Sequence, residues 1–187
     1  MGFWTLARVV HDKDLMCNVR DETVMAFRNE ILDVPYLTER CPVLNSIWLE
    51  SLRLSAGLSS VRHITDDTVI GGKVLRRGDK VLISGRQLHL DEAVFGGDPF
   101  SFDPQRFLRN PKLEQHPSFR PFGGGATLCP GRILAKHAVF TFIALALQRF
   151  EIESATAQPF PRCEERNAGF GITMSNDDLL LRLKAKG

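Results

Sequence analysis

The sequence predicts a mainly α-helical fold with small antiparallel β-sheets, and three segments carry this prediction. Residues 132–150 contain the longest apolar stretch of the chain, 138–147, which only Thr141 interrupts, as is typical of a buried helix. Residues 44–54 predict a second helix, entered through Pro42 near its first turn. Residues 68–75 hold two short apolar runs separated by a glycine pair, which predicts a hairpin with a tight turn.

The composition is that of an ordinary globular domain. The 187 residues are 43% hydrophobic and 25% charged, which excludes a disordered chain. A net charge of +2 does not indicate a nucleic-acid partner. The stretch 138–147 is about half the length of a membrane span, so we expect no membrane segment in this chain.

The N-terminal segment predicts helix over residues 3–32. Asp12 is a suitable N-cap, and Leu15 and Val19 begin an apolar stripe after it. Residues 3–10 are strongly apolar and start abruptly, without the basic flank of a signal peptide. We therefore expect the chain to be a truncated part of a longer domain.

The remaining segments are shorter. We predict strands within residues 64–90, among them 80–84, which Gly78 and Asp79 introduce. Residues 91–121 are rich in Pro, Gly and Phe and predict an irregular meander, and such long irregular stretches are usually functional. Residues 168–184 predict a final hairpin.

The four cysteines occupy positions 17, 41, 129 and 163, and no two have C-x-x-C spacing. This spacing argues against zinc ribbons, thioredoxin-like redox sites and covalently attached c-type haem. The cysteines form no recognisable disulfide framework, so we expect them to be reduced.

One cysteine lies in a chemically distinctive loop, residues 122–131, which reads Phe-Gly-Gly-Gly-Ala-Thr-Leu-Cys-Pro-Gly. Cys129 comes just before the predicted helix 132–150, whose positive end favours a thiolate. The glycines allow tight turns and close approach to a flat cofactor. A phosphate-binding loop would need Gly-Lys-Ser/Thr, which is absent. The residues alone leave open a haem thiolate or a cysteine nucleophile with a distant histidine.

The loop contains F-x-x-G-x-x-x-C-x-G complete, as Phe122, Gly125, Cys129 and Gly131. It therefore resembles the haem-binding signature of the cytochrome P-450 superfamily. The resemblance implies that Cys129 is the thiolate ligand of the iron in haem b, with Phe122, Gly125 and Gly131 around the cofactor. In that family the thiolate promotes cleavage of the O–O bond.

Two further segments support the resemblance. Glu50 shares a helix face with Ile47 and Leu54, so its carboxylate should be buried and must be matched by a positive charge. Glu50 and Arg53 are similar to the E-x-x-R pair of the family, and Arg106 lies in a segment like its F-x-P-x-R-F motif. The resemblance implies a structural network of these three residues, with no catalytic part.

Two polar residues are candidates for the haem propionates. Arg62 stands where family members often place a propionate partner, and the alternative is a surface arginine at a strand start. Thr127 replaces the commoner Arg or His two residues before the cysteine. A hydroxyl donates one neutral hydrogen bond, so it should hold the cofactor less firmly.

The segments 50–55, 89–91, 126–132 and 168–172 look like the sterol 7α-hydroxylase and prostacyclin synthase branch of the superfamily. This likeness implies a hydrophobic, sterol- or lipid-like substrate into which one oxygen atom of O2 is inserted. It also implies electrons from NADPH, delivered by a flavoprotein reductase that docks on the face around the cysteine loop.

Order and spacing imply that the whole chain, 1–187, is the C-terminal portion of a cytochrome P-450 domain, with residues 3–10 closing its long central helix. The acid–Thr pair of the family precedes this part, so we expect no catalytic residue within the chain and no activity of the chain alone. A full-length relative would lie on the endoplasmic reticulum membrane. We expect this chain to be without the anchor, and therefore soluble or of unknown location.

Other functions remain open at this point. The chain could be a non-catalytic fragment, or a haem-thiolate isomerase of lipid peroxides, which would need no NADPH. A cysteine hydrolase is a further alternative. It would remain possible only if Cys129→Ser left haem binding intact.

Overall fold

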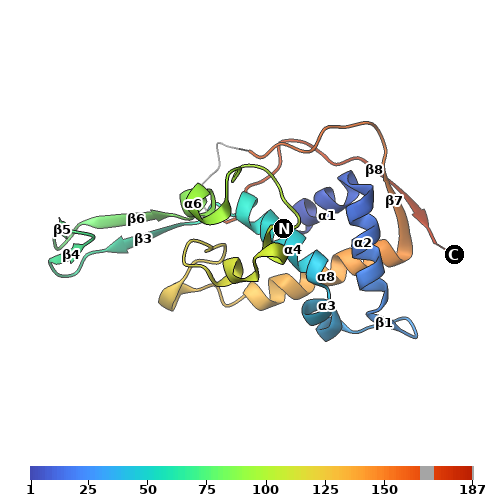
Figure 1. Ribbon diagram of the computed structural model, residues 1–187, viewed down its shortest axis with the longest axis horizontal. Coiled ribbons are helices and arrows are strands. Elements are labelled where there is room, and N and C mark those ends of the chain that lie inside the picture. The colour runs from blue at the N-terminus through green and yellow to red at the C-terminus, as the bar shows by residue number, and fades with distance from the viewer. Residues whose placement is uncertain (165–170, 187) are drawn as a thin grey trace.

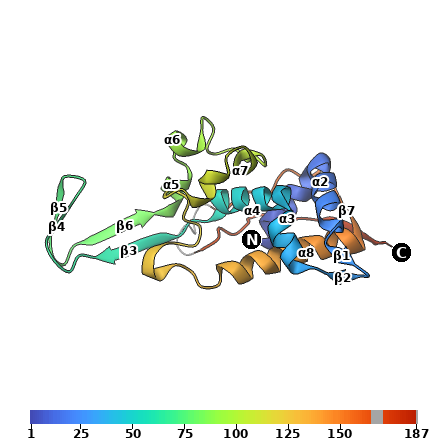
Figure 2. The ribbon, with the colours of Figure 1, turned by 60° about the horizontal axis from the view of Figure 1, so that its bottom comes forward.

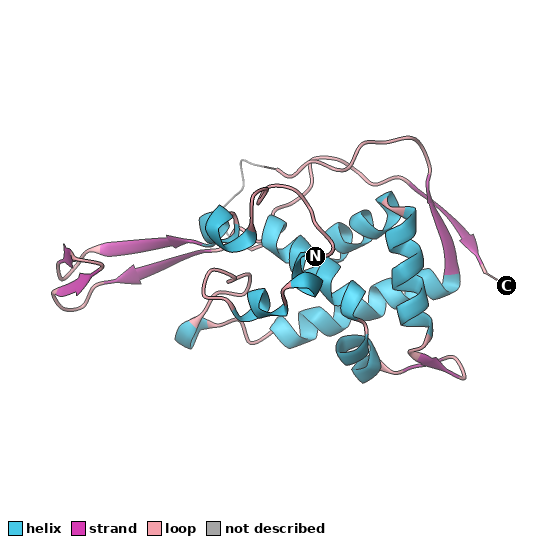
Figure 3. Ribbon diagram, in the orientation of Figure 1, coloured by secondary structure: helices cyan, strands magenta, loops and turns pink. Residues whose placement is uncertain are grey.

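The computed structural model describes residues 1–164 and 171–186. In these ranges a body of packed helices carries four two-stranded antiparallel sheets at its periphery (Figures 1 and 3). The prediction of helices with small antiparallel sheets is confirmed.

The N-terminal segment forms two helices, so the prediction of helix over residues 3–32 is correct as far as residue 24 and wrong beyond it, where two short strands follow. Helix α1 spans Gly2–His11 and helix α2 spans Lys13–Val24. Asp12 between them is extended, with φ −128°, and its carboxylate accepts a hydrogen bond from Leu15 N at 2.9 Å. The predicted N-cap is therefore present, and capping a new helix is what interrupts the old one.

A small hairpin and a short helix follow α2. Strands β1 (Phe27–Arg28) and β2 (Ile31–Leu32) are joined by Asn29 and Glu30, both at positive φ. Helix α3 (Val34–Arg40), which the sequence analysis did not predict, starts at Asp33, whose side chain caps Tyr36 N at 3.0 Å.

Helices α4 (Pro42–Ser55) and α8 (Arg132–Arg149) form the centre of the core. Ten of the fourteen residues of α4 are buried, because α1, α2 and α7 pack around it. Glu22 of α2 caps α4, accepting hydrogen bonds from Val43 N at 2.8 Å and Leu44 N at 3.1 Å. No described helix has both the length and the apolar character needed to cross a bilayer.

A long two-stranded ribbon projects from the body (Figures 1 and 2). Strand β3 (Ser59–His63) pairs with β6 (Lys80–Ser84), and the predicted hairpin of β4 (Thr68–Ile70) and β5 (Lys73–Leu75) forms its tip. The predicted limits 64–90 are wrong at both ends.

The ribbon begins with β3, before residue 64, and ends with β6. Ser84 accepts a hydrogen bond from Gln87 N and starts helix α5 (Gly85–His89).

The predicted meander, 91–121, contains only short elements. These are α6 (Glu92–Phe95), α7 (Arg106–Arg109) and the 3₁₀ helix η1 (Pro111–Gln115). Between them the backbone is irregular and folds over α4.

The predicted final hairpin over 168–184 is wrong for the described residues, and its residues 168–170 lie outside them. Strand β8 (Leu181–Ala185) pairs instead with β7 (Phe150–Ser154), which directly follows α8 (Figure 3). Ile152 of β7 is 3% exposed, so burying this side chain against the helical body selects the long-range pairing.

Candidate functional site

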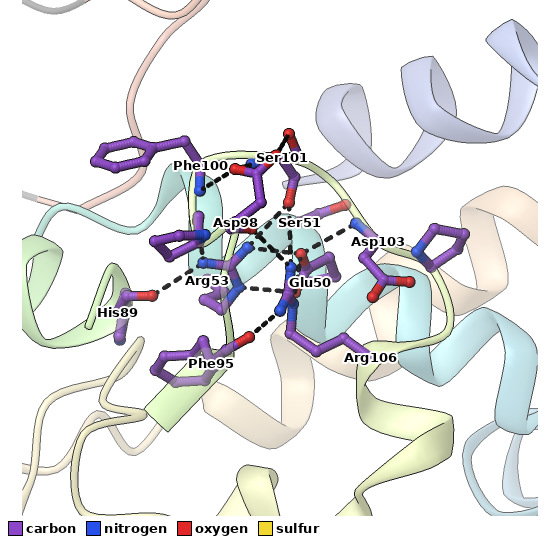
Figure 4. A network of polar contacts seen from close by, with 12 residues as sticks. Glu50, Ser51, Arg53, His89, Phe95, Asp98, Phe100, Ser101, Asp103 and Arg106 are labelled. Carbon is purple, nitrogen blue, oxygen red and sulfur yellow. Dashed lines mark hydrogen bonds and ion pairs between the residues drawn. The ribbon is translucent and has the colours of Figure 1, made fainter. Parts of the chain in front are cut away.

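The buried carboxylate of Glu50 is the centre of a polar network (Figure 4). Its two oxygens accept hydrogen bonds from Arg53 Nη2 at 2.6 Å and Arg53 Nε at 2.8 Å, a two-point pairing across one turn of α4. Arg106 Nε of α7 donates to the same carboxylate at 3.1 Å, and so does the backbone N–H of Asp103. Glu50 and Arg53 are 0% and 1% exposed, so these charges are desolvated and satisfied by each other.

The two guanidinium groups use their remaining N–H groups on main-chain carbonyls. Arg53 donates to the carbonyls of His89 at 2.9 Å, Pro99 at 2.6 Å and Ser101 at 3.2 Å. Arg106 donates to the carbonyls of Phe95, Asp98 at 3.2 Å and Ser101 at 3.4 Å. Two arginines thus hold an irregular segment whose carbonyls have no helix or sheet to satisfy them.

The cysteine loop lies between the meander and α8. It contains a short 3₁₀ helix, η2 (Gly125–Thr127), and closes through a hydrogen bond from Cys129 N to Phe122 O at 3.0 Å. Gly123 and Gly125 have φ +76° and +63°, a region that disfavours any residue with a Cβ. Cys129 itself is partly exposed, immediately before the first turn of α8.

The first turn of α8 directs unpaired N–H groups toward this end of the loop. Its N-cap, Gly131, provides no side-chain cap, and Arg132 Nη1 donates to the carbonyl of Cys129 at 3.1 Å. A Cβ on Gly131 would lie 3.8 Å from Cys129 Sγ, an ordinary contact, and φ there is −79°. The fold therefore does not require glycine at 131, in contrast to 125.

Arg62 and Thr127, predicted from distant parts of the sequence, are brought together. Arg62 Nη2 donates to Thr127 Oγ1 at 2.8 Å, and both side chains are exposed. They lie beside a cavity of about 360 Å³ that is lined by Leu58, Ile83 and Gly123, among others. The pair joins the base of the ribbon to the cysteine loop and presents both polar groups to solvent.

Phe122 packs toward the core. Its ring centroid lies 6.0 Å from that of Trp48 on α4. The two rings share a cavity of about 550 Å³ with Leu128, Arg132 and Lys136. Burial lowers the pKa of Lys136, whose Nζ donates to Thr38 O at 3.2 Å.

These residues fit a haem. The loop offers a single accessible sulfur, and its glycine backbone carries no side chain at 123–125. Arg62 and Thr127 offer one cation and one hydroxyl, which suit carboxylate groups. In the described part of the chain, no three His, Cys, Asp or Glu residues are grouped as ligands for a bare metal ion. A single thiolate suits a metal whose other ligands come from a macrocycle.

Two further residues contribute to this region, and neither was assigned to the site from the sequence. Ser46 Oγ donates to Pro104 O at 2.6 Å and fastens the meander to α4. His89 is completely buried beside Arg53. Both act through or upon main-chain groups, so no spacing rule in the sequence indicates them.

Comparison with known proteins agrees with the site. A family model described as cytochrome P450 matches residues 3–181. Cholesterol 7-alpha-monooxygenase of Cricetulus griseus is 28% identical over 98% of the chain, and cytochrome P450 7A1 of Sus scrofa is 29% identical over 98%. Steroid 17-alpha-hydroxylase/17,20 lyase of Gallus gallus is 31% identical over 91%. The chain spans 41%, 42% and 34% of the lengths of these relatives.

The family match and the sterol 7α-hydroxylase relatives confirm the resemblance predicted from the loop signature. The chain belongs to the cytochrome P450 family.

Proposed function

We propose that residues 1–187 are the C-terminal, haem-binding part of a cytochrome P450 monooxygenase, with Cys129 as the thiolate ligand of haem b. The observation that carries the proposal is the position of Cys129. Its sulfur is partly exposed at the N-terminus of α8, in a glycine loop that its own backbone hydrogen bond closes. Haem with an axial thiolate supplies the chemistry that promotes cleavage of the O–O bond.

The chain's own residues hold and orient the cofactor. Cys129 lies just before the first turn of α8, whose N-cap Gly131 provides no side-chain cap. Arg62 and Thr127 would bind the propionates, with charge from the guanidinium and a neutral hydrogen bond from the hydroxyl. Phe122, packed on Trp48, and Gly125, at positive φ, would keep the loop close to the macrocycle, and Gly131 would leave space beside the sulfur.

We propose a hydrophobic, sterol- or lipid-like substrate and electrons from NADPH through a flavoprotein reductase. The names of the relatives, which include cholesterol and steroid monooxygenases, support the substrate class. Arg132 and Lys136, beside the cysteine loop, support docking of an acidic partner on that face. For the full-length protein we propose the endoplasmic reticulum membrane as the location.

We further propose that the 187-residue chain alone has no monooxygenase activity. It exposes large apolar side chains on α8 and on the ribbon, such as Leu134 at 72% and Leu82 at 66%. Such surfaces need a covering partner, here the remainder of the domain, before a site from which water is excluded can form. Turnover of a sterol by the purified chain with a reductase would refute this.

The ligand assignment is tested in a chimera in which residues 3–181 replace the matching part of a full-length relative. The reduced carbon monoxide complex should absorb near the wavelength that names the family, and Cys129→Ser should abolish this band. Cys17→Ser, at an exposed cysteine of α2, is the matched control and should leave the band intact.

Retention of the band in Cys129→Ser would contradict the assignment. Turnover that does not need NADPH would replace a monooxygenase with an isomerase of lipid peroxides.

A further inference from the structure

His89 is the last residue of α5 and is fully buried between the polar network and the segment that leads to the cysteine loop. Its ring packs 5.5 Å from the ring of Phe119. The mechanism proposed above assigns it no role, yet both its main chain and its side chain form hydrogen bonds with residues far away in the sequence.

The two hydrogen bonds of His89 point in different directions. Its carbonyl accepts from Arg53 Nη1 at 2.9 Å, which ties it to the Glu50 network (Figure 4). Its Nε2 accepts from the backbone N–H of Arg120 at 2.9 Å. One residue therefore connects a buried charge network on α4 to the chain just before the cysteine loop.

The connection continues to the cysteine through the backbone. Arg120 O accepts from Gly123 N at 3.1 Å, and Phe122 O accepts from Cys129 N at 3.0 Å. Phe122 O and Gly123 N belong to the same peptide group, whose plane is rigid. A connected series of hydrogen bonds thus leads from Glu50 through Arg53, His89 and Arg120 to the cysteine loop.

The acceptor role of His89 requires one protonation state. Nε2 has a lone pair for Arg120 N–H only when the ring is neutral with its proton on Nδ1. Burial lowers the pKa of His89 to about 4, the carbonyls of Ala56 and Arg53 oppose this shift, and the charge of Arg53 adds to it. Nδ1 itself makes no hydrogen bond of normal geometry within the described residues. The neutral ring is therefore the form at pH 7.

We infer that His89 is a positioning residue that sets the place of the cysteine loop relative to α4, through its acceptor bond to Arg120. Only the statement that the positioned sulfur binds iron rests on the proposed function. The alternative is that His89 only fills space in the core. Replacing its ring by one without a nitrogen acceptor distinguishes these roles, because only a positioning residue would lose its effect on the cysteine loop.

The first test uses the unaltered chain without haem. Nuclear magnetic resonance should show a through-bond coupling between the Arg120 amide nitrogen and His89 Nε2, and ring shifts of the Nδ1-protonated tautomer. Absence of the coupling in the folded protein would overturn the inference. This measurement needs no variant, so the folding of a variant cannot confuse it.

The second test compares variants by amide hydrogen exchange. His89→Phe keeps an aromatic ring of similar shape but removes the acceptor. We expect the amides of Arg120, Gly123 and Cys129 to exchange about tenfold faster, which corresponds to the loss of one hydrogen bond, with α8 unchanged. His89→Gln, whose side-chain oxygen can accept near the position of Nε2, should restore most of the protection.

His116→Phe is the matched control. His116 Nδ1 also accepts one meander amide, from Ser118 N at 3.1 Å, but it does not connect that amide to α4. Its variant should leave the amides of Arg120, Gly123 and Cys129 unchanged. Equal exchange in His89→Phe and the unaltered chain, or a uniform increase over all helices, would overturn the positioning role.

These outcomes are separate from the proposed function. If Cys129 did not bind iron, the coupling and the exchange pattern would be unaffected. If the coupling were absent, the thiolate band of the chimera would still test Cys129.

Discussion

Glu50 and Arg53 are 0% and 1% exposed, whereas residues 125–128 of the neighbouring cysteine loop are exposed, Leu128 at 39%. In the network, charged side chains turn inward and hold the backbone of other segments. In the loop a backbone hydrogen bond from Cys129 N to Phe122 O closes the turn. The side chains of Thr127 and Leu128 are exposed. The comparison teaches that rigidity is supplied from one region while the other stays free for a ligand.

Neutralising the buried carboxylate of Glu50 should have the largest effect on the stability of the fold. Glu50→Gln leaves two guanidinium groups without their counter-charge, so we expect the free energy of unfolding to fall by about 3–5 kcal/mol, measured by urea denaturation. Glu92→Gln, at an exposed glutamate of α6, is the control and should change it by less than about 0.5 kcal/mol. Similar costs for the two variants would contradict the view of Glu50 as the centre of the network.

Acid should weaken the connection between the two regions. The pKa of His89 is about 4 in the fold, below its ordinary value of 6.5, because burial disfavours the charged ring. The folded state therefore binds fewer protons than the unfolded chain, so the stability from His89 is complete above pH 6.5 and is lost as the pH falls toward 4. We expect a loss of about 2 kcal/mol between pH 7 and pH 5.

Urea denaturation at several pH values measures this loss. The same measurements on His89→Gln report the pH dependence that comes from all other titrating groups. The difference in the free energy of unfolding between the two proteins at each pH should be the contribution of His89. Parallel pH profiles for the two proteins would count against a neutral, buried His89.

Substitutions at two glycines of the loop distinguish what the backbone conformation needs from what haem binding needs. Gly125 has φ +63°, so Gly125→Ala should cost about 1–2 kcal/mol in the free energy of unfolding. Gly131 has φ −79° and space for a Cβ, so Gly131→Ala should cost less than about 0.5 kcal/mol. Under the proposed function Gly131→Ala should nevertheless weaken haem binding, because its new methyl group lies next to the sulfur. Unchanged haem affinity would show that only the turn matters.

The smallest effect on folding is expected at the exposed pair. Thr127→Ala removes one exposed hydrogen bond to Arg62 and should change the free energy of unfolding by less than about 0.5 kcal/mol. Haem affinity should fall, as measured by absorbance titration of the chimera, because a propionate partner is lost. Thr68→Ala, at an exposed threonine of β4 near the tip of the ribbon, is the control, and an equal fall there would remove the case for Thr127.

Much of the local structure follows from sequence patterns. The glycine pair 71–72 predicts the tip hairpin because both residues need positive φ, which is observed at +57° and +75°. The position of Glu50 on an apolar face predicts a buried carboxylate, and it is buried. Asp12 was predicted as an N-cap, and it caps α2 directly after α1 ends.

The sequence by itself determined the helices at 44–54 and 132–150 and the glycine turn at 71–72, that the Glu50 charge is buried, and that a cysteine precedes a helix in a glycine loop. Only the tertiary structure decided that β8 pairs with β7, that Arg62 meets Thr127, and that His89 joins Arg53 to Arg120. The physical reason is that the β7–β8 pairing and the bonds of His89 use backbone carbonyls and amides, which nearly every residue carries, and that Arg62 and Thr127 lie 65 residues apart in the sequence. No residue pattern can mark a partner of that kind, and only the path of the folded chain brings it within hydrogen-bond distance.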